Sequence, residues 1–324
     1  MRLRTRVITL ASAVSLILIL STAYYWPVQD EYHPLNEEWN GCSKIVNAVP
    51  NSTLVFSYSE TLPEQRFLVI VGPSLEFSQK ETSYVRALLE SGGTVLLADD
   101  IGAGNSLLEL LTVPARFSGK SMQDLLYFSK RPDFPLIMNF SASPVADNVT
   151  AILMNRPSYL QVENYSMVTV IASSSAFSFV VDGGQQPRAN ETLQSYPVMA
   201  SVRIGQGLLV LVSDPSVFVN EMVGLFDNMK LFENLLWMSG GSIAFDVAHI
   251  ARAPLTDIRT EFRTGIDSIR SSFLFSTWGV YTQSLIVVAV VLVLFLHIRR
   301  NAKIRTPGKE SHPFYADSRS AAPS

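Results

Sequence analysis

The chain has 324 residues, of which 48% are hydrophobic, with 25 Lys and Arg against 28 Asp and Glu, a net charge of −3. This length allows a buried core of ordinary size. The single cysteine, Cys42, excludes a fold held together by disulfide bonds within the chain.

Charge is distributed unevenly along the chain. Residues 1–26 carry three basic groups and no acidic group, residues 27–277 carry 16 basic and 26 acidic groups, and residues 278–324 carry six basic and two acidic groups. The three net charges are +3, −10 and +4, which sum to −3. A central part this acidic argues against nucleic acid as a partner.

Two uncharged apolar stretches flank the acidic part, at residues 7–26 and 278–298. Each has about 20 residues, enough to cross a hydrocarbon core of ~30 Å as a helix. Basic flanks stay on the cytoplasmic side of a membrane. We therefore predict a two-pass protein of the cell (plasma) membrane, in contact with the bilayer, with both termini cytoplasmic and the main domain extracytoplasmic. The basic flanks are Arg2, Arg4, Arg6, Arg299, Arg300, Lys303 and Arg305.

A cleaved signal peptide is an alternative for the first stretch, because Ser21, Thr22 and Ala23 offer a small-residue cleavage site. The apolar run exceeds the usual signal core of about 7–15 residues, which favours a retained helix. Both outcomes leave the main domain outside the cell.

These patterns divide the chain into six parts. They are a cytoplasmic N-terminus (1–6), a transmembrane helix (7–26), an extracytoplasmic domain (27–250), an amphipathic stalk (251–277), a second transmembrane helix (278–298) and a basic, disordered cytoplasmic tail (299–324). Five N-x-[ST] sequons in the extracytoplasmic domain are candidates for glycosylation, which would require a surface position: Asn51, Asn139, Asn148, Asn164 and Asn190.

Strands and helices alternate in the first half of the domain. Residues 67–72 form a continuous apolar run, typical of a strand that is buried on both faces. Ser78 and Glu81 form a capping box for a helix that ends at Gly92. A second buried strand at 94–98, a loop at 99–104 and a helix from about residue 105 follow. This order predicts an α/β fold with a parallel sheet covered by helices.

The same pattern returns near residue 208. We predict a strand at 208–213, helices at 217–226 and 228–238, and a short strand at 243–245. Between them, the sequence indicates three further strands, at 149–154, 168–171 and 177–181.

Three polar loops follow predicted strands, and ligands bind outside the carboxyl ends of the strands of an open parallel sheet. Their acidic, amide and imidazole side chains could bind a hard cation or a polar ligand. In the competing interpretation they shape turns and cap helices, with Asn105 and Ser216 as caps and Asp214 in a turn. The candidate ligand-binding residues are Asp99, Asp100, Asn105, Asp214, Asn220, Asp246 and His249.

Motifs for catalysis or cofactor binding are incomplete. Gly102 and Gly104 lack the third glycine of a phosphate-binding loop, and adjacent acids would repel phosphate, so we expect no nucleotide. No further ligand motif accompanies Asp246 and His249, so we expect no metal and no cofactor. The chain has no nucleophile elbow, and Cys42 is expected to be a small buried residue. His249 is expected to fix the junction between domain and stalk.

Four motifs occur in a particular order, at residues 39–43 (Trp-Asn-Gly-Cys-Ser), 77–81 (Phe-Ser-x-x-Glu), 91–105 and 213–220. In the order and spacing of these motifs, the chain resembles the prokaryotic membrane family of domain of unknown function 4350 over about residues 30–250. The resemblance implies a membrane-anchored fold similar to class I glutamine amidotransferases and flavodoxin-like domains. It also implies operation beside a MoxR-type ATPase and its membrane-bound partner proteins.

The resemblance has two departures. Family members often have Asp-Glu-x-His where this chain has Asp246-Val-Ala-His249, and the amidotransferase elbow is absent. We therefore expect no catalytic residue and a binding or scaffold domain in an envelope-associated assembly. The alternative is an envelope hydrolase or transferase that uses Asp100, Asp214, Asp246 and His249, which would require these side chains to converge in one pocket. A third hypothesis is signal transmission, which would need a partner because the cytoplasmic ends are short.

Overall fold

The computed structural model describes residues 11–16, 18–22, 27–49, 52–181 and 192–253. Residues 11–16 and 18–22 are helical. Within the described ranges, no helix combines the length and apolar character that crossing a bilayer requires. The second predicted span, most of the stalk, the tail and the sequons at Asn51 and Asn190 lie outside the described residues. The sequons at Asn139, Asn148 and Asn164 are exposed.

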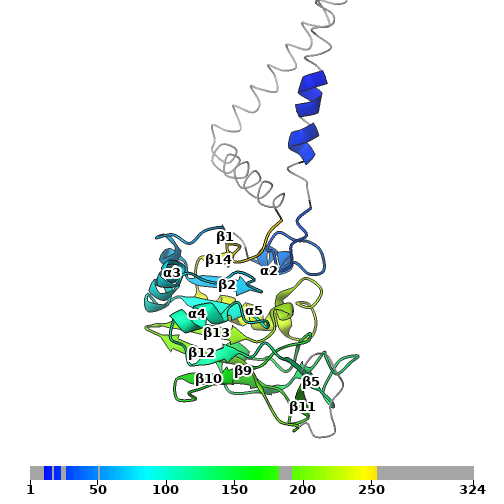
Figure 1. Cartoon of the computed structure of the whole chain (residues 1–324), viewed down its shortest axis with the longest axis vertical. Helices are drawn as coiled ribbons and strands as arrows, with labels where there is room; N and C mark the ends of the chain where they lie inside the picture. Colours follow the sequence, from blue (N-terminus) through cyan, green and yellow to red (C-terminus); the bar gives the residue numbers. More distant parts are fainter. Residues whose placement is uncertain (1–10, 17, 23–26, 50–51, 182–191, 254–324) are drawn as a thin grey trace, which may run out of the picture. The chain divides into compact units, whose positions relative to one another are not determined.

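An eight-stranded sheet forms the centre of the domain (Figure 1). Its first five strands are parallel and the last three are joined antiparallel. The predicted α/β class is confirmed, but the sheet is mixed and not wholly parallel. In order across the sheet, the strands are β1 (Thr53–Val55), β14 (Ile243–Asp246), β2 (Phe67–Val71), β3 (Thr94–Ala98), β13 (Gly207–Val212), β12 (Pro197–Ile204), β10 (Val168–Ser173) and β7 (Asn139–Phe140).

Two hydrophobic cores lie on the two faces of this sheet, because successive side chains of a strand point to opposite faces. Phe67, Val69 and Val71 belong to the core that α5 (Asn228–Ser239) covers. Leu68 and Ile70 belong to the other core, with apolar residues of α3 (Gln79–Glu90) and α4 (Asn105–Leu110). Burial on both faces explains why the central strands read as continuous apolar runs.

The predicted elements around β2 and β3 are confirmed. Ser78 caps α3 and Glu81 completes the capping box, since the Ser78 backbone N–H donates to Glu81 Oε2 at 2.9 Å. Gly92, at φ +91°, follows the end of the helix. The helix predicted at 228–238 is also confirmed, as α5.

The helix predicted at 217–226 is wrong. A short 3₁₀ turn, η3 (Pro215–Phe218), stands there instead. The backbone N–H groups of Asn220 and Glu221 donate to carbonyl oxygens of the N-terminal segment, at Gly41 (2.7 Å) and Trp39 (3.0 Å). A helix would need those N–H donors for its own backbone hydrogen bonds. Bonds to a segment distant in sequence therefore take the place of the helix.

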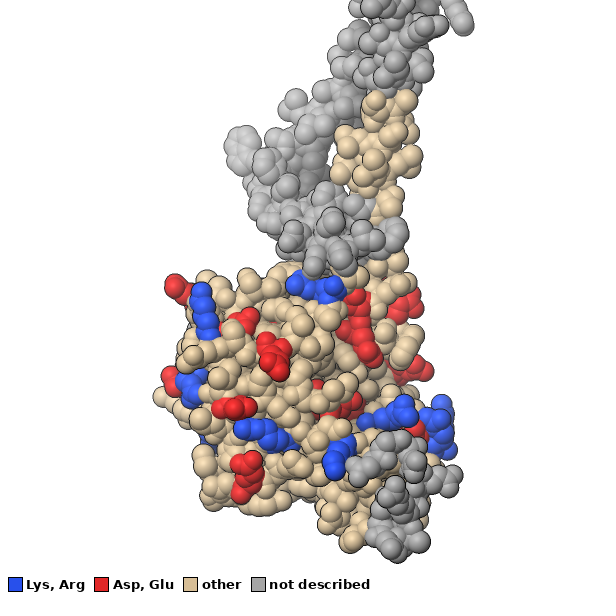
Figure 2. All heavy atoms as spheres, viewed as in Figure 1, with Lys and Arg blue, Asp and Glu red and all other residues tan. Residues whose placement is uncertain are grey.

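Short elements complete the domain. Three two-stranded sheets pair β5 with β11, β4 with β9 and β6 with β8. The strands predicted at 149–154, 168–171 and 177–181 correspond to β8, β10 and β11. On the face that Figure 2 draws, acidic and basic side chains are interspersed. The bounds are α2 (Ser43–Asn47), η1 (Leu62–Glu64), β4 (Ala115–Phe117), β5 (Ser121–Asp124), β6 (Leu136–Ile137), η2 (Pro144–Ala146), β8 (Ile152–Leu153), β9 (Leu160–Val162) and β11 (Ser178–Val181).

Gly72, directly after β2, makes a testable close contact. Its φ is +58°, and a Cβ added there would lie 2.1 Å from Cδ2 of Tyr32. Gly240 has nearly the same φ, +59°, but open space around it. Gly72→Ala is expected to lower the free energy of unfolding by about 2 kcal/mol more than Gly240→Ala, because only the first adds a clash to the backbone strain. Urea denaturation of both variants measures this, and equal losses would contradict the contact.

Candidate functional site

One buried amide, that of Asn220, fastens the N-terminal segment to the domain. Its side chain is 3% exposed. Its Nδ2 donates to the carbonyl oxygens of Asn36 (2.9 Å) and Glu38 (2.6 Å), and its Oδ1 accepts from the backbone N–H of Lys44 at 2.9 Å. The Lys44 ammonium also donates to the Asn220 carbonyl oxygen at 2.6 Å. Residues 36–44 are therefore held against the chain beyond η3.

The same segment places Tyr32 at the carboxyl end of β2. Tyr32 has φ +58° and covers Gly72. Burial, followed by the charges of Asp100, Glu31 and Asp214, raises the pKa of the Tyr32 phenol well above its usual range. A side chain of the N-terminal segment thus meets the acidic residues that follow β3 and β13.

A cleft of about 540 Å³ lies between these residues and the loops at 129–134 and 155–156. We define its acidic side as Glu31, Asp100 and Glu221, and its basic side as Lys130 and Arg156. A second cavity of about 340 Å³ shares Glu31, Tyr32 and Asp100 with it. The cleft is also lined by Tyr32, Trp39, Asn40, Ser129, Phe134, Leu153, Asn155, Ser216, Val219, Met222, Leu225 and Phe226.

Strained backbone concentrates around this cleft. Among the described residues, six that are not glycine have a positive φ, and four of them line the cleft: Tyr32, Lys130, Arg156 and Phe226. Such conformations cost about 1–3 kcal/mol each and persist where the surrounding structure enforces them, often at functional sites. The strain therefore favours this cleft as the functional site.

Asp99 and Asp100, after β3, have different roles. Asp99 is buried and holds the loop, since its Oδ2 accepts from the Gly104 backbone N–H at 2.7 Å and its Oδ1 from that of Asp100 at 2.8 Å. Burial raises the pKa of Asp99 against these hydrogen bonds. Asp100 lines both cavities, and burial followed by the charge of Asp99 raises its pKa to about 6.

Asp214, after β13, forms the turn that the sequence predicts. Its Oδ1 accepts from the Ser216 backbone N–H at 2.8 Å and caps η3, while its Oδ2 accepts from the Asn155 backbone N–H at 2.6 Å. Burial, to which the charge of Asp100 adds, raises the pKa of Asp214 to about 7. Asp100 therefore lines the cleft, whereas Asp214 is near enough to be affected by its charge but is fully buried and lines neither cavity.

The two candidate amides are structural. Asn105 was expected to cap α4, but the N-cap is Gly104, and Asn105 instead clips β4 by two hydrogen bonds to Phe117, of 2.9 and 3.0 Å. Ser216 was also expected as a cap, and that position belongs to Asp214. Asn220 holds the N-terminal segment.

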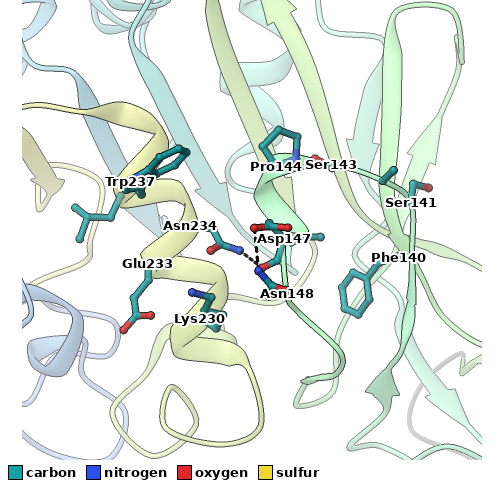
Figure 3. Close-up of a pocket in the computed structure, with 13 residues that line it drawn as sticks. Phe140, Ser141, Ser143, Pro144, Asp147, Asn148, Lys230, Glu233, Asn234 and Trp237 are labelled. Carbon is teal, nitrogen blue, oxygen red and sulfur yellow. Dashed lines mark hydrogen bonds between the residues drawn. The ribbon is translucent and has the colours of Figure 1, made fainter.

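A larger groove, of about 1170 Å³, lies between α5 and the chain around η2 (Figure 3). Asn234 spans it at its base, donating to the carbonyl oxygens of Val145 (3.1 Å) and Asp147 (2.8 Å). Trp237 on its border is 83% exposed. The groove follows the short edge strand β7 and not the parallel strands β2, β3 and β13, and Asn148 is the one residue of its lining with a positive φ. It is the weaker candidate.

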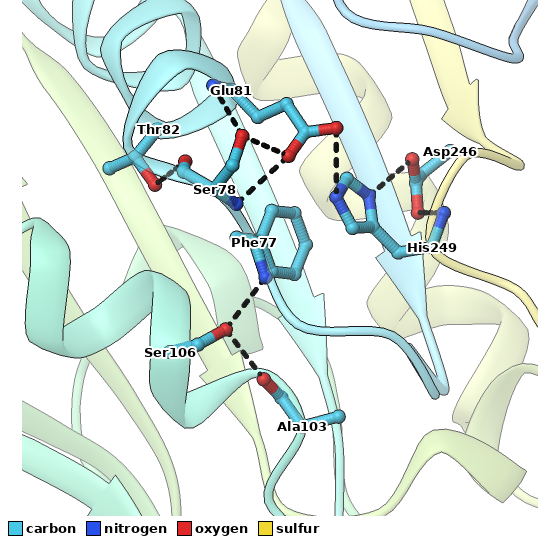
Figure 4. Close-up of polar contacts among 8 residues, drawn as sticks. All are labelled: Phe77, Ser78, Glu81, Thr82, Ala103, Ser106, Asp246 and His249. Carbon is cyan, nitrogen blue, oxygen red and sulfur yellow. Dashed lines mark hydrogen bonds and ion pairs between the residues drawn. The ribbon is translucent and has the colours of Figure 1, made fainter.

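Asp246 and His249 form a separate buried cluster with Glu81 (Figure 4). His249 Nδ1 lies 3.1 Å from Asp246 Oδ1, its Nε2 lies 3.7 Å from Glu81 Oε1, and its ring stacks on Phe77 at 3.6 Å between centroids. The imidazole is 2% exposed. Burial acts to raise the pKa of Glu81, but hydrogen bonds from Ser78 and the nearby His249 lower it overall.

This cluster fastens the end of the domain. The His249 carbonyl oxygen accepts from the backbone N–H groups of Ser74 (2.9 Å) and Leu75 (3.1 Å), and the Ala253 N–H donates to Asp30 Oδ1 at 3.1 Å. Cys42 is buried as expected, and burial raises the pKa of its thiol, which opposes use as a nucleophile.

The candidate residues therefore form two groups. Asp100 lines the cleft and its charge acts on the buried Asp214, whereas Asp246 and His249 lie among Glu81, Phe77 and Tyr58 and line neither rim cavity. Within the described ranges, no three His, Cys, Asp or Glu residues are arranged to hold a metal ion. Sequence reasoning did not select Glu31, Tyr32, Lys130 or Arg156. Three of the four sequence motifs do contribute lining residues, since the motif at 39–43 contains Trp39, the one at 91–105 contains Asp100 and the one at 213–220 contains Ser216.

Comparison with known families gives one match. Residues 34–236 match the family described as domain of unknown function (DUF4350). The chain belongs to this family. The match runs from before α2 into α5, which it covers up to residue 236, and includes most of the cleft lining. No curated protein matches the chain.

Solved structures are similar to the domain only at a low level. The mmIFT52 N-terminal domain is 17% identical, with a TM-score of 0.45 over 57% of this chain and 81% of that one. A β-galactosidase from Bacillus circulans sp. alkalophilus is 12% identical, with a TM-score of 0.33 over 54% and 23%. A cytoplasmic protein from Salmonella typhimurium is 13% identical, with a TM-score of 0.31 over 67% and 81%.

The raised pKa of Asp100 predicts a pH-dependent stability. Because its folded value, about 6, exceeds its ordinary value of 3.8, the folded state binds the proton more tightly, and stability falls as pH rises between these values. Asp100→Asn is therefore expected to stabilise the protein by about 1–2 kcal/mol at pH 8 and by much less near pH 4.

Thermal melting at both pH values measures this, with Glu37→Gln as the control because Glu37 is exposed and lines neither rim cavity. If Asp100→Asn lost stability equally at both pH values, the Asp100 carboxylate would act only through its structural contacts, which would contradict the expected pH dependence.

Proposed function

We propose that this protein is a membrane-anchored extracytoplasmic binding domain whose binding site is the cleft. The observation that carries the proposal is the cleft itself, where strained residues and a partly buried carboxylate converge at the carboxyl ends of β3 and β13. Ligands of open α/β sheets bind at such strand ends.

The anchoring part of the proposal is supported by the two apolar stretches and their basic flanks. The finer fold assignment, similar to class I glutamine amidotransferases and flavodoxin-like domains, is supported by the parallel β2-α3-β3 unit and helices on both faces. Association with a MoxR-type ATPase and other membrane proteins of an envelope assembly is proposed from the resemblance to the family. The net charge of −10 over residues 27–277 argues against nucleic acid as a partner.

A second candidate function is an envelope hydrolase or transferase that uses the Asp and His residues. His249 supports it, because an imidazole between two carboxylates is a common arrangement for acid–base chemistry. Against it, the imidazole is buried and lines neither rim cavity, whereas a general base must reach its substrate. We therefore favour binding over catalysis.

Cysteine labelling tests both location and site, because the native Cys42 is buried. Three single variants are compared: Trp39→Cys at the cleft, Trp237→Cys at the groove, and Ser311→Cys in the predicted cytoplasmic tail. A membrane-impermeant maleimide on intact cells is expected to label positions 39 and 237 but not 311. After purification, labelling at 39 should accelerate several-fold relative to 237, because a ligand that covers the cleft is removed.

Two results would overturn the proposal. Labelling of position 311 in intact cells, with positions 39 and 237 protected, would reverse the topology. An unchanged ratio of the labelling rates at 39 and 237 after purification would show that nothing occupies the cleft in cells.

A further inference from the structure

The cleft contains opposite charges that are not paired with each other. Arg156 lies near Asp133, outside the lining, with its Nε 3.7 Å from Asp133 Oδ2. Within the described part of the chain, no ion pair joins Lys130 or Arg156 to Glu31, Asp100 or Glu221. Glu31, Asp100, Glu221 and Lys130 are therefore available to a ligand in the cleft, and Arg156 lines the same cleft while its Nε forms an ion pair with Asp133.

The acidic side is suited to a cation. Glu31 and Asp100 line the cleft together with Tyr32, and among the described residues no ion pair joins either carboxylate to a basic side chain. Tyr32 and Trp39 add aromatic surface. An ammonium group gains from both carboxylates and aromatic faces, most strongly where water is partly excluded.

The basic side is suited to a carboxylate. Lys130 and Arg156 are exposed and line the cleft, and both stand on left-handed backbone, at φ +64° and +52°. Arg and Lys both bind carboxylates by charge-assisted hydrogen bonds. Apolar surface from Leu153, Val219 and Met222 also lines the cleft and could receive an aliphatic side chain.

We propose that the cleft binds a zwitterionic ligand of the α-amino acid class, either an amino acid or a short peptide with free ends. Its ammonium group lies at Glu31 and Asp100, and its carboxylate lies at Lys130 and Arg156. This rests on the proposed function, which assigns binding to the cleft, and adds the chemical class of the ligand. A volume of about 540 Å³ is within the range of small-molecule sites, about 300–1000 Å³.

Titration calorimetry of the purified full chain in detergent tests this with four probes. They are leucyl-leucine, its N-acetylated form, its C-amidated form and leucine. Each blocked form lacks one charge and keeps the apolar side chains. Both are expected to bind at least about tenfold more weakly than the free dipeptide, the loss of one charge-assisted contact. Leucine distinguishes the source: binding equal to the dipeptide indicates a free amino acid, and weaker binding indicates a peptide.

Variants assign each charge to its side of the cleft. Glu31→Gln and Asp100→Asn should remove the preference for the free over the N-acetylated dipeptide, and Lys130→Gln and Arg156→Gln should remove the preference for the free over the C-amidated form. Glu31, Lys130 and Arg156 are exposed, so their variants are expected to fold. Exposed residues outside the lining, Glu37→Gln and Lys80→Gln, are the matched controls and should leave all affinities unchanged.

Three results would overturn the inference. An amidated dipeptide that binds as tightly as the free one would indicate a site for cations alone. If every variant lost affinity for all four probes equally, the acidic and basic sides of the cleft would not bind separate groups of the ligand. Absence of binding by all four probes up to millimolar concentration would exclude the ligand class, while occlusion of position 39 in cells would still support the cleft as a binding site.

Discussion

The buried amide of Asn220 is the interaction on which the rest of the site depends. It bonds to three positions of residues 36–44 and is separated from them by more than 170 residues of sequence. Removing one partner from a buried set of hydrogen bonds leaves the others unsatisfied, at about 1–3 kcal/mol for each group. The set therefore holds the N-terminal segment as part of the domain. The backbone bonds from Asn220 to Gly41 and from Glu221 to Trp39 act with it, and together they keep the segment that carries Glu31 and Tyr32 against the domain.

That arrangement has an electrostatic cost. Asp100 and Asp214 are buried near each other, and the pKa of each is raised because ionisation there is disfavoured. The central strands β2, β3 and β13 bury apolar side chains in both hydrophobic cores, which stabilises the domain against this cost. Sites that bind charged ligands commonly trade stability for function in this way. A cation placed between the carboxylates would remove the penalty.

Sequence reasoning succeeded where local patterns decide the structure. The apolar runs of β2 and β3, the capping box of Ser78 and Glu81 and the α5 helix were all legible, because the rules that form them act over a few residues. The predicted helix at 217–226 failed because its backbone donors bond to Trp39 and Gly41 instead. The sequence did not predict the antiparallel strand β12, because its pairing with β10 depends on a partner strand elsewhere in the chain and not on its own residues. Lys130 and Arg156 belong to no local motif, because only the folding of distant segments brings them to the cleft.

The candidate residues show the same limit. Asp and Asn after strands were correctly placed at strand ends, but sequence could not separate a residue that lines a cavity from one that holds a loop. Asp100 lines the cleft, whereas the adjacent Asp99 is absent from the cleft lining and holds the loop through hydrogen bonds. The role predicted for His249 at the junction with the stalk stays a prediction, while its carbonyl oxygen accepts hydrogen bonds from Ser74 and Leu75 within the domain.

Hydrogen exchange of the full chain tests the central claim, that the N-terminal segment is an integral part of the fold. The backbone N–H groups of Tyr32, Asn36 and Cys42 are hydrogen-bonded within the segment, and those of Asn220 and Glu221 bond to it. The account predicts that the amides of residues 32–44 and 219–221 exchange slowly and as one cooperative unit. Exchange of residues 32–44 at the rate of an unstructured peptide, while α3 stays protected, would contradict it.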